Sequence, residues 1–164
     1  MLDPYRILIT GSRSWTDQKT IAEAIFKAID DQGLTPGRDY VIVHGACQQG
    51  ADALAAKVCE DEAWWLDRLG AALVAEPHPA DWRSCAEHCH PAHRRPRPDG
   101  TSYCPAAGLR RDADMVAAGA DICLAFIAPC AKPVCRKRKP HGSHGASHTA
   151  RIAEKAGIPT RRWP

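Results

Sequence analysis

Three cysteines and one histidine between residues 85 and 104 have the types and the spacing of a metal site. Cys85, Cys89 and His93 are spaced four residues apart, and Cys104 follows after ten more residues. A structural zinc site takes four such sulfur and nitrogen ligands in a tetrahedron. The ten intervening residues include no aliphatic side chain that could anchor them to a core. We therefore predict a zinc ion bound by these four residues, within an inserted loop of residues 80–108.

Two alternatives to this zinc site stay open. His88 or His90 could replace one of the ligands, or the segment could be a polar loop with incidental thiols. A second group of ligand types follows later in the chain, at Cys130, Cys135, His141 and His144. It could bind a second metal, or its two histidines could face a bound ligand instead.

Three glycine-bearing loops could bind a phosphate, because each precedes an expected helix whose first amides favour an anion. The candidate contacts are Gly11, Ser12 and Arg13 in the first loop, His44, Gly45, Ala46, Gly50 and Asp52 in the second, and Ser143, Gly145, Ala146 and Ser147 in the third. Each loop could also be a plain turn or helix cap. One such loop is weak evidence, but three at one edge of a sheet indicate a nucleotide-like anion. Neither a Walker A loop nor the usual dinucleotide fingerprint is present.

Alternating strands and helices must position these loops. Short apolar runs predict strands over residues 6–10, 40–43, 71–75, 121–127 and 158–160. Helices are expected after Asp17 and over about 51–69, 110–118 and 148–156. Strands that are continuously apolar are typical of parallel sheets covered on both faces. We predict a single Rossmann-like α/β domain over residues 1–164, with a mainly parallel sheet and helices on both faces.

The composition limits where the protein acts and what it contacts. The chain has 164 residues, 45% of them hydrophobic, and a net charge of +3. It has neither a run approaching the roughly 20 apolar residues of a membrane span nor a signal peptide. We expect a cytoplasmic protein with no membrane partner, whose cysteines are thiols or metal ligands. The basic runs Arg94–Arg97 and Arg136–Lys139 are either solvated or contact nucleic acid, and the adjacent Trp64 and Trp65 leave a homodimer contact open.

Four motifs carry a resemblance to a known family. They are Thr10-Gly-Ser-Arg13, His44-Gly-Ala-x-x-x-Gly50-Ala-Asp52, Arg110-Arg-Asp-x-x-Met115, and Gly145-Ala-Ser-His148 with Ala156-Gly-Ile-Pro159. Together they resemble the YspA/YpsA-related branch of the SLOG superfamily, in particular its actinobacterial and actinophage members. The resemblance implies a Rossmann-like fold with a nucleotide or nucleotide-derived ligand in its cleft. Relatives include the Lonely Guy phosphoribohydrolases and DprA.

The resemblance also bears on catalysis. The enzyme relatives use an arginine before a Met-bearing helix, which Arg110 or Arg111 matches. They also use a glutamate in a glycine-rich loop, where this chain has Thr149. Asp52 or Asp112 could supply the missing carboxylate. We therefore expect binding of a nucleotide-like ligand, for sensing or sequestration. N-glycosidic hydrolysis and nucleic-acid binding are the alternatives.

Overall fold

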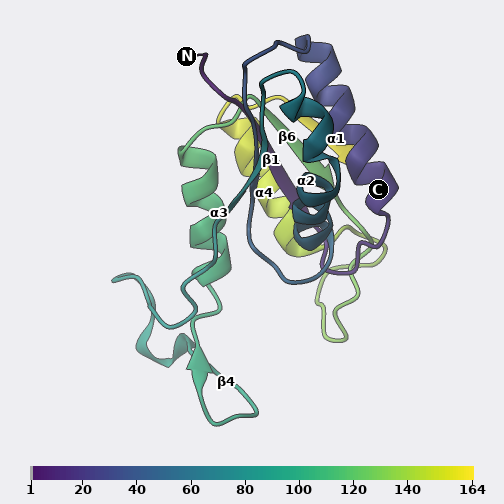
Figure 1. The fold of residues 1–164 in the computed structure, drawn as a ribbon. Coiled ribbons are helices and arrows are strands. Elements are labelled where there is room, and N and C mark those ends of the chain that lie inside the picture. Colours follow the sequence, from purple (N-terminus) through teal and green to yellow (C-terminus); the bar gives the residue numbers. More distant parts are fainter. Residues whose placement is uncertain (1) are drawn as a thin grey trace.

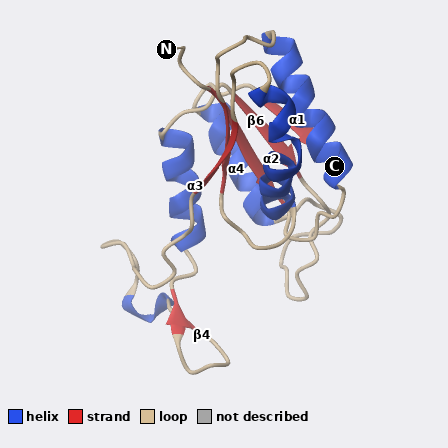
Figure 2. Ribbon diagram, in the orientation of Figure 1, coloured by secondary structure: helices blue, strands red, loops and turns tan. Residues whose placement is uncertain are grey.

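Five parallel strands form the sheet at the centre of the structure, a computed structural model that describes residues 2–164. Their order is β3-β2-β1-β6-β7, and they comprise Tyr5–Gly11 (β1), Tyr40–His44 (β2), Leu73–Pro77 (β3), Ile122–Phe126 (β6) and Thr160–Trp163 (β7). Every pairing between neighbours is parallel. Figures 1 and 2 show helices in front of and behind this sheet. The predicted α/β architecture is confirmed.

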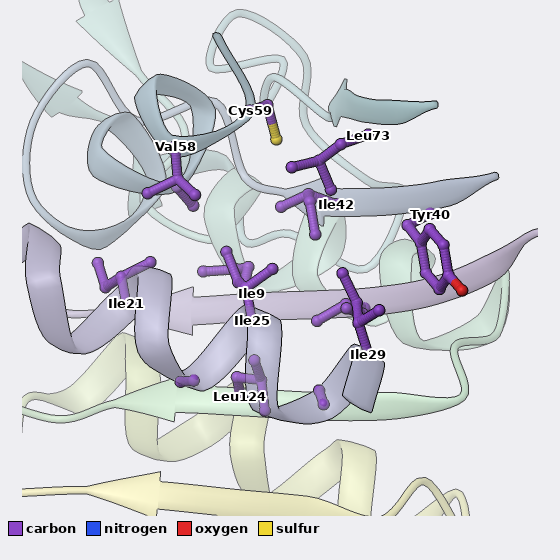
Figure 3. Packing of buried hydrophobic residues seen from close by; sticks show 14 of the residues in the cluster. Ile9, Ile21, Ile25, Ile29, Tyr40, Ile42, Val58, Cys59, Leu73 and Leu124 are labelled. Carbon is purple, nitrogen blue, oxygen red and sulfur yellow. The ribbon is translucent and has the colours of Figure 1, made fainter. Parts of the chain in front are cut away.

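The helices cover the two faces of the sheet in pairs. They are Gln18–Gln32 (α1), Ala51–Asp67 (α2), Ala107–Ala117 (α3) and His144–Lys155 (α4). Alternate residues of β1 point to opposite faces, so that Ile7 and Ile9 pack with α1 and α2 while Leu8 packs with α3 and α4. Figure 3 shows Ile21 and Ile25 of α1 meeting Ile9 in the larger of these two cores.

Asp17 begins α1 as the sequence predicts. Its carboxylate accepts a hydrogen bond of 3.0 Å from the backbone N–H of Thr20, which satisfies one of the free amides of the first turn. The isoleucines at 21, 25 and 29 then share one buried face of the helix.

The boundaries of four predicted elements were wrong by a few residues, among them α3, which starts at Ala107 rather than 110. β3 lies at 73–77 rather than 71–75, and its final residue, Pro77, is accommodated because β3 is an edge strand. β7 lies at 160–163 rather than 158–160, where Trp163 stacks on Phe126 with ring centroids 5.0 Å apart. α4 starts at His144 instead of 148, because the N–H of Ser147 already donates to the carbonyl of Ser143.

The segment between β3 and α3 carries a small hairpin that the sequence analysis did not predict. Arg95–Pro96 (β4) pairs antiparallel with Ser102–Tyr103 (β5), after a short 3-10 turn at Pro91–His93 (η1). In Figure 1 this segment and the light-green loop between β6 and α4 both extend below the sheet. Both segments carry Cys/His groups. Within residues 2–164, every helix is too short or too polar to cross a lipid bilayer.

Candidate ligand cleft and candidate metal centres

A cleft of about 810 Å³ opens beyond the carboxyl ends of β1, β2 and β3. Four loops and one helix line it, through Arg13, Gly45, Ala46, Cys47, Gln48, Gln49, Pro79, Ala80, Trp82, Arg97 and Arg111. A smaller hollow of about 330 Å³ shares Arg13, Trp82 and Arg97 and adds Tyr103. The position agrees with the general rule that α/β sheets bind ligands at their carboxyl edge.

The cleft is strongly cationic. Three arginines line it, and no aspartate or glutamate among the described residues does. Within residues 2–164 Arg13 and Arg97 make no ion pair, so both guanidinium groups are available to a ligand. The guanidinium of Arg97 lies 5.1 Å from the centroid of the Tyr103 ring, a cation–π arrangement that positions it without neutralising it.

Arg111, rather than Arg110, is the arginine that reaches the cleft from α3. Its Nη1 donates to the carbonyls of Gly45 and of His78, the latter at 3.0 Å. Its Nε donates to Asp112 at 2.7 Å. A Cβ atom on Gly45 would lie only 2.6 Å from the Arg111 guanidinium carbon. Gly45 is therefore needed to let this arginine lie flat against the second loop.

Gly50 is needed for packing between two loops and does not line the cleft. Its φ of 74° and ψ of −151° lie in a region that essentially only glycine adopts. A Cβ there would lie 2.3 Å from the carbonyl oxygen of Ser12 and 2.5 Å from the Cα of Arg13. The first and second loops thus touch backbone to backbone, which places Arg13 beside residues 45–49.

The two candidate carboxylates lie behind the wall of the cleft. Asp52 is buried and accepts a hydrogen bond of 3.2 Å from the N–H of Cys47, which holds the second loop in its turn. Burial raises the pKa of Asp52 to about 6. Asp112 is also buried and accepts from Arg111. Neither residue lines the cleft.

The third glycine-bearing loop stands apart from the cleft. Ser143, Gly145, Ala146 and Ser147 are absent from its lining. A Cβ added to Gly145 would meet nothing within 4 Å. Thr149 is buried, and its hydroxyl donates to the carbonyl of Gly145 at 3.1 Å. We expected all three glycine-bearing loops to surround one ligand, but only the first and the second contribute to the lining of this cleft.

The end of β1 explains this separation. Gly11 and Ser12 lie at the switch in strand order between β1 and β6. The hydroxyl groups of Ser12 and Ser143 are 2.5 Å apart, and the Ser12 hydroxyl also accepts from the N–H of Ala128. A Cβ on Gly11 would collide with Ala51. Protein groups therefore fill the switch point, and the cleft lies to one side of it, toward β3.

The first Cys/His group comes together largely as its spacing predicts. The ligand atoms of Cys85, His93 and Cys104 lie within 4.8 Å of one another. His93 Nε2 is 3.5 Å from the sulfur of Cys85 and 3.1 Å from that of Cys104. Cys89 lies outside this group of three, with its sulfur 4.0 Å from that of Cys104. Tetrahedral metal–sulfur and metal–nitrogen bonds would separate the ligands by roughly 3.3–3.8 Å.

Hydrogen bonds around this first group orient its ligands. His93 Nδ1 contacts the carbonyl of His90, which leaves Nε2 to face the thiols. His90 itself accepts from the N–H of Ala92 through Nδ1, so its side chain caps the short turn and does not join the group. Arg110 donates to the sulfur of Cys104 at 3.3 Å and lowers the pKa of that thiol to about 6.

The first group also supports one wall of the cleft. The N–H of Cys104 donates to the carbonyl of Trp82 at 2.9 Å, and the Trp82 and Tyr103 rings pack edge to face with centroids 6.1 Å apart. Trp82 and Arg97 line the cleft and belong to the same segment, which a metal bound by this Cys/His group would hold in place.

The second group is more complete than the first. The ligand atoms of Cys130, Cys135, His141 and His144 all lie within 4.8 Å of one another. Neither histidine lines the cleft; both point their Nε2 atoms toward Cys135 instead. The basic run 136–139 is exposed and also lies outside the lining.

Several residues of the cleft carry little signal of that position in the sequence. Gln48 and Gln49 stand between the two glycines of the second loop and belong to no charge or metal-ligand pattern. Arg97 was assigned only to a basic run, because its approach to Arg13 depends on the unpredicted hairpin. Pro79 and Ala80 carry no chemical signal and enter through the path of the chain after β3.

Comparisons with known proteins agree with this arrangement. Residues 5–84 match the family model described as "YspA, cpYpsA-related SLOG family". The chain is 35% identical over 154 residues to the Gene 61 protein of Mycobacterium phage D29, which covers 94% of this chain and 92% of that protein. No solved structure matches significantly. Both Cys/His groups lie beyond the residues that the family model matches.

Proposed function

Because the chain belongs to the YspA, cpYpsA-related SLOG family, we propose that it binds a phosphate-bearing nucleotide or nucleotide derivative in the cleft beyond β1, β2 and β3. The observation that carries this proposal is the lining of that cleft, which has three arginines and no carboxylate. A cavity with that charge favours an anion and disfavours a cation.

Each part of the lining suits a part of a nucleotide. Arg13 and Arg97 can each donate to phosphate oxygens, in the two-pronged geometry typical of guanidinium. Arg111, whose charge is balanced by Asp112, holds the second loop through the Gly45 carbonyl. Trp82 gives a flat aromatic surface on which a base can stack, and the amides of Gln48 and Gln49 can hydrogen-bond its edge.

The same lining supports binding in preference to cleavage. N-glycosidic hydrolysis needs a carboxylate near the sugar, and the two candidates, Asp52 and Asp112, are engaged behind the wall. The hydroxyl of Thr149 is engaged by its own helix. A missing general acid or base typically lowers the rate by 10²–10⁴-fold. We propose that the protein senses or sequesters its ligand.

We also propose a zinc ion at Cys85, Cys89, His93 and Cys104. Thiolate and imidazole ligands favour zinc over the hard cations that prefer oxygen. His93 Nε2 lies 3.5 Å and 3.1 Å from the sulfurs of Cys85 and Cys104, near the separations of a tetrahedral zinc site, and Cys89, whose sulfur is 4.0 Å from that of Cys104, would have to move closer to the other two ligands to complete it. Bound there, the ion would hold the wall that carries Trp82 and Arg97.

Equilibrium binding of AMP, ADP, NAD and ADP-ribose tests the proposal, measured by calorimetry on the wild type and on Arg13→Gln and Arg97→Gln. We expect at least one of these nucleotides to bind, and each variant to weaken it roughly 10-fold to 100-fold, because a lost charge-assisted hydrogen bond costs about 1.5–3 kcal/mol.

Arg151→Gln is the matched control, because Arg151 is exposed on α4 and lies outside the cleft. Its affinity should equal that of the wild type. Chromatography of the mixtures after long incubation should recover the nucleotide intact. If none of the four binds, or if the two cleft variants bind as the control does, the proposal fails. Rapid release of free base would identify a hydrolase instead.

A further inference from the structure

The loop between β6 and α4 holds a second Cys/His group that no part of the proposed nucleotide site uses. We propose that Cys130, Cys135, His141 and His144 form a second, structural metal site, which takes zinc or another tetrahedral metal of the same class and fastens this loop to the start of α4.

The distances within the second group are those of ligands around one ion. The sulfur of Cys135 lies 3.4 Å from Nε2 of His141 and 3.2 Å from Nε2 of His144, and these two nitrogens are 3.2 Å apart. Bond lengths of zinc to nitrogen and sulfur predict separations of roughly 3.3–3.8 Å between ligands of a tetrahedral site. Cys130 lies within 4.8 Å of all three and completes a Cys₂His₂ set.

The hydrogen bond at the far side of His141 supports a metal at the near side. Its Nδ1 lies 3.0 Å from the carbonyl oxygen of Arg138, so Nδ1 carries the proton and donates it. This bond turns Nε2 toward His144 and Cys135. A backbone carbonyl bonded to the far ring nitrogen is the usual orienting partner of a metal-bound histidine.

The loop has little else to hold it in place. Residues 129–143 include five Lys or Arg and no acidic residue, so their charges repel one another. Val134 is 89% exposed and does not anchor the loop to a core. Backbone bonds join only the two ends, as between the N–H of Cys130 and the carbonyl of His141. A metal bound by Cys135 would attach the middle of the loop to both ends.

Metal content measured by elemental analysis and native mass spectrometry tests this second site. The wild type, expressed in zinc-supplemented medium and passed over a weak chelating resin, should retain two zinc ions per chain. Cys135→Ser should retain one, as should Cys85→Ser. Cys59→Ala is the control for loss of a thiol, because Cys59 lies on the buried face of α2, in the core, and it should retain two.

His141→Ala, a change in a half-exposed loop residue, gives a second test should Cys135→Ser fail to fold. It should also retain one ion. The proposal is overturned if neither Cys135→Ser nor His141→Ala lowers the metal content below that of the wild type. A wild type that retains a single ion, lost in Cys135→Ser and kept in Cys85→Ser, would support this site and contradict the proposed zinc at Cys85. Metal content is measured without nucleotide, so this site and the proposed nucleotide binding can each fail while the other stands.

Limited trypsin digestion tests whether the metal fastens the loop. The bonds after Arg136, Lys137 and Arg138 are cleavable, whereas those after Lys132 and Lys139 precede proline. Cleavage after residues 136–138 should be at least about tenfold slower in the wild type than in Cys135→Ser, because proteolysis follows local opening. Equal rates would contradict a fastening role.

Discussion

At the scale of single residues, glycines in this protein serve different needs that look alike in the sequence. A Cβ atom at Gly45 would overlap the side chain of Arg111, and one at Gly50 would overlap the backbone of the first loop. A Cβ atom at Gly145 would meet no atom within 4 Å. Only the first of these bears directly on the charge of the cleft. Glycine content therefore located the loops but not the ligand contacts.

Gly45→Ala should displace Arg111 and weaken nucleotide binding while the fold persists. The new Cβ would overlap the guanidinium group, which lies at the end of a flexible side chain and can move. We expect affinity to fall about tenfold or more, by the loss of one charged contact. Gly145→Ala is the paired control. It should leave affinity unchanged and not lower the melting temperature, because alanine suits a helix better than glycine. Equal effects of the two changes on affinity would contradict our placement of the cleft.

Asp52 should make the stability of the protein depend on pH near neutrality. Burial raises its pKa to about 6 in the folded state from an ordinary 3.8. The contribution of protonated Asp52 to the free energy of unfolding is therefore complete below its pKa in the unfolded state, and it is lost as pH rises through about 6. Asp52→Asn removes this dependence. From about pH 5 to about pH 7.5, its free energy of unfolding should rise by roughly 1 kcal/mol relative to the wild type. Urea unfolding at several pH values measures this, and a constant difference would show that Asp52 titrates normally.

At the scale of elements, the sequence predicted most of the sheet and the position of the first two loops after β1 and β2. Buried strands such as residues 6–10 are short apolar runs between turn residues, and Asp17 is a recognisable cap. The hairpin at 95–103 could not be predicted, because two-residue strands leave no periodic signal. The choice between Arg110 and Arg111 depends on the rotation of α3, which adjacent residues do not reveal.

The segment carrying β4 should depend on its metal, whereas the sheet should not. In Cys85→Ser, amide hydrogen exchange across residues 80–106 should accelerate on the order of tenfold or more, because a metal at the Cys/His group would join both ends of the segment. Amides of β1 and β6 lie in the buried core and should keep their wild-type rates. Unchanged exchange in the segment would mean that packing of Trp82 on Tyr103 suffices to order it.

At the scale of the whole molecule, the cleft and the second Cys/His group lie at different positions along the carboxyl edge of the sheet. The cleft lies toward β3, and the second Cys/His group lies beyond β6. The contact between Ser12 and Ser143 joins them across the switch point. We propose that the nucleotide occupies the first of these places, the cleft toward β3.

Nuclear magnetic resonance of the ¹⁵N-labelled protein, titrated with the tightest-binding nucleotide of the panel, tests that claim most directly. The backbone amides of residues 45–49 and the indole N–H of Trp82 should shift together as the site fills. The indole N–H groups of Trp64, exposed on α2, and Trp163, stacked on Phe126, should not move. Shifts confined to residues 136–147, or the absence of any shift in residues 45–49, would contradict the account.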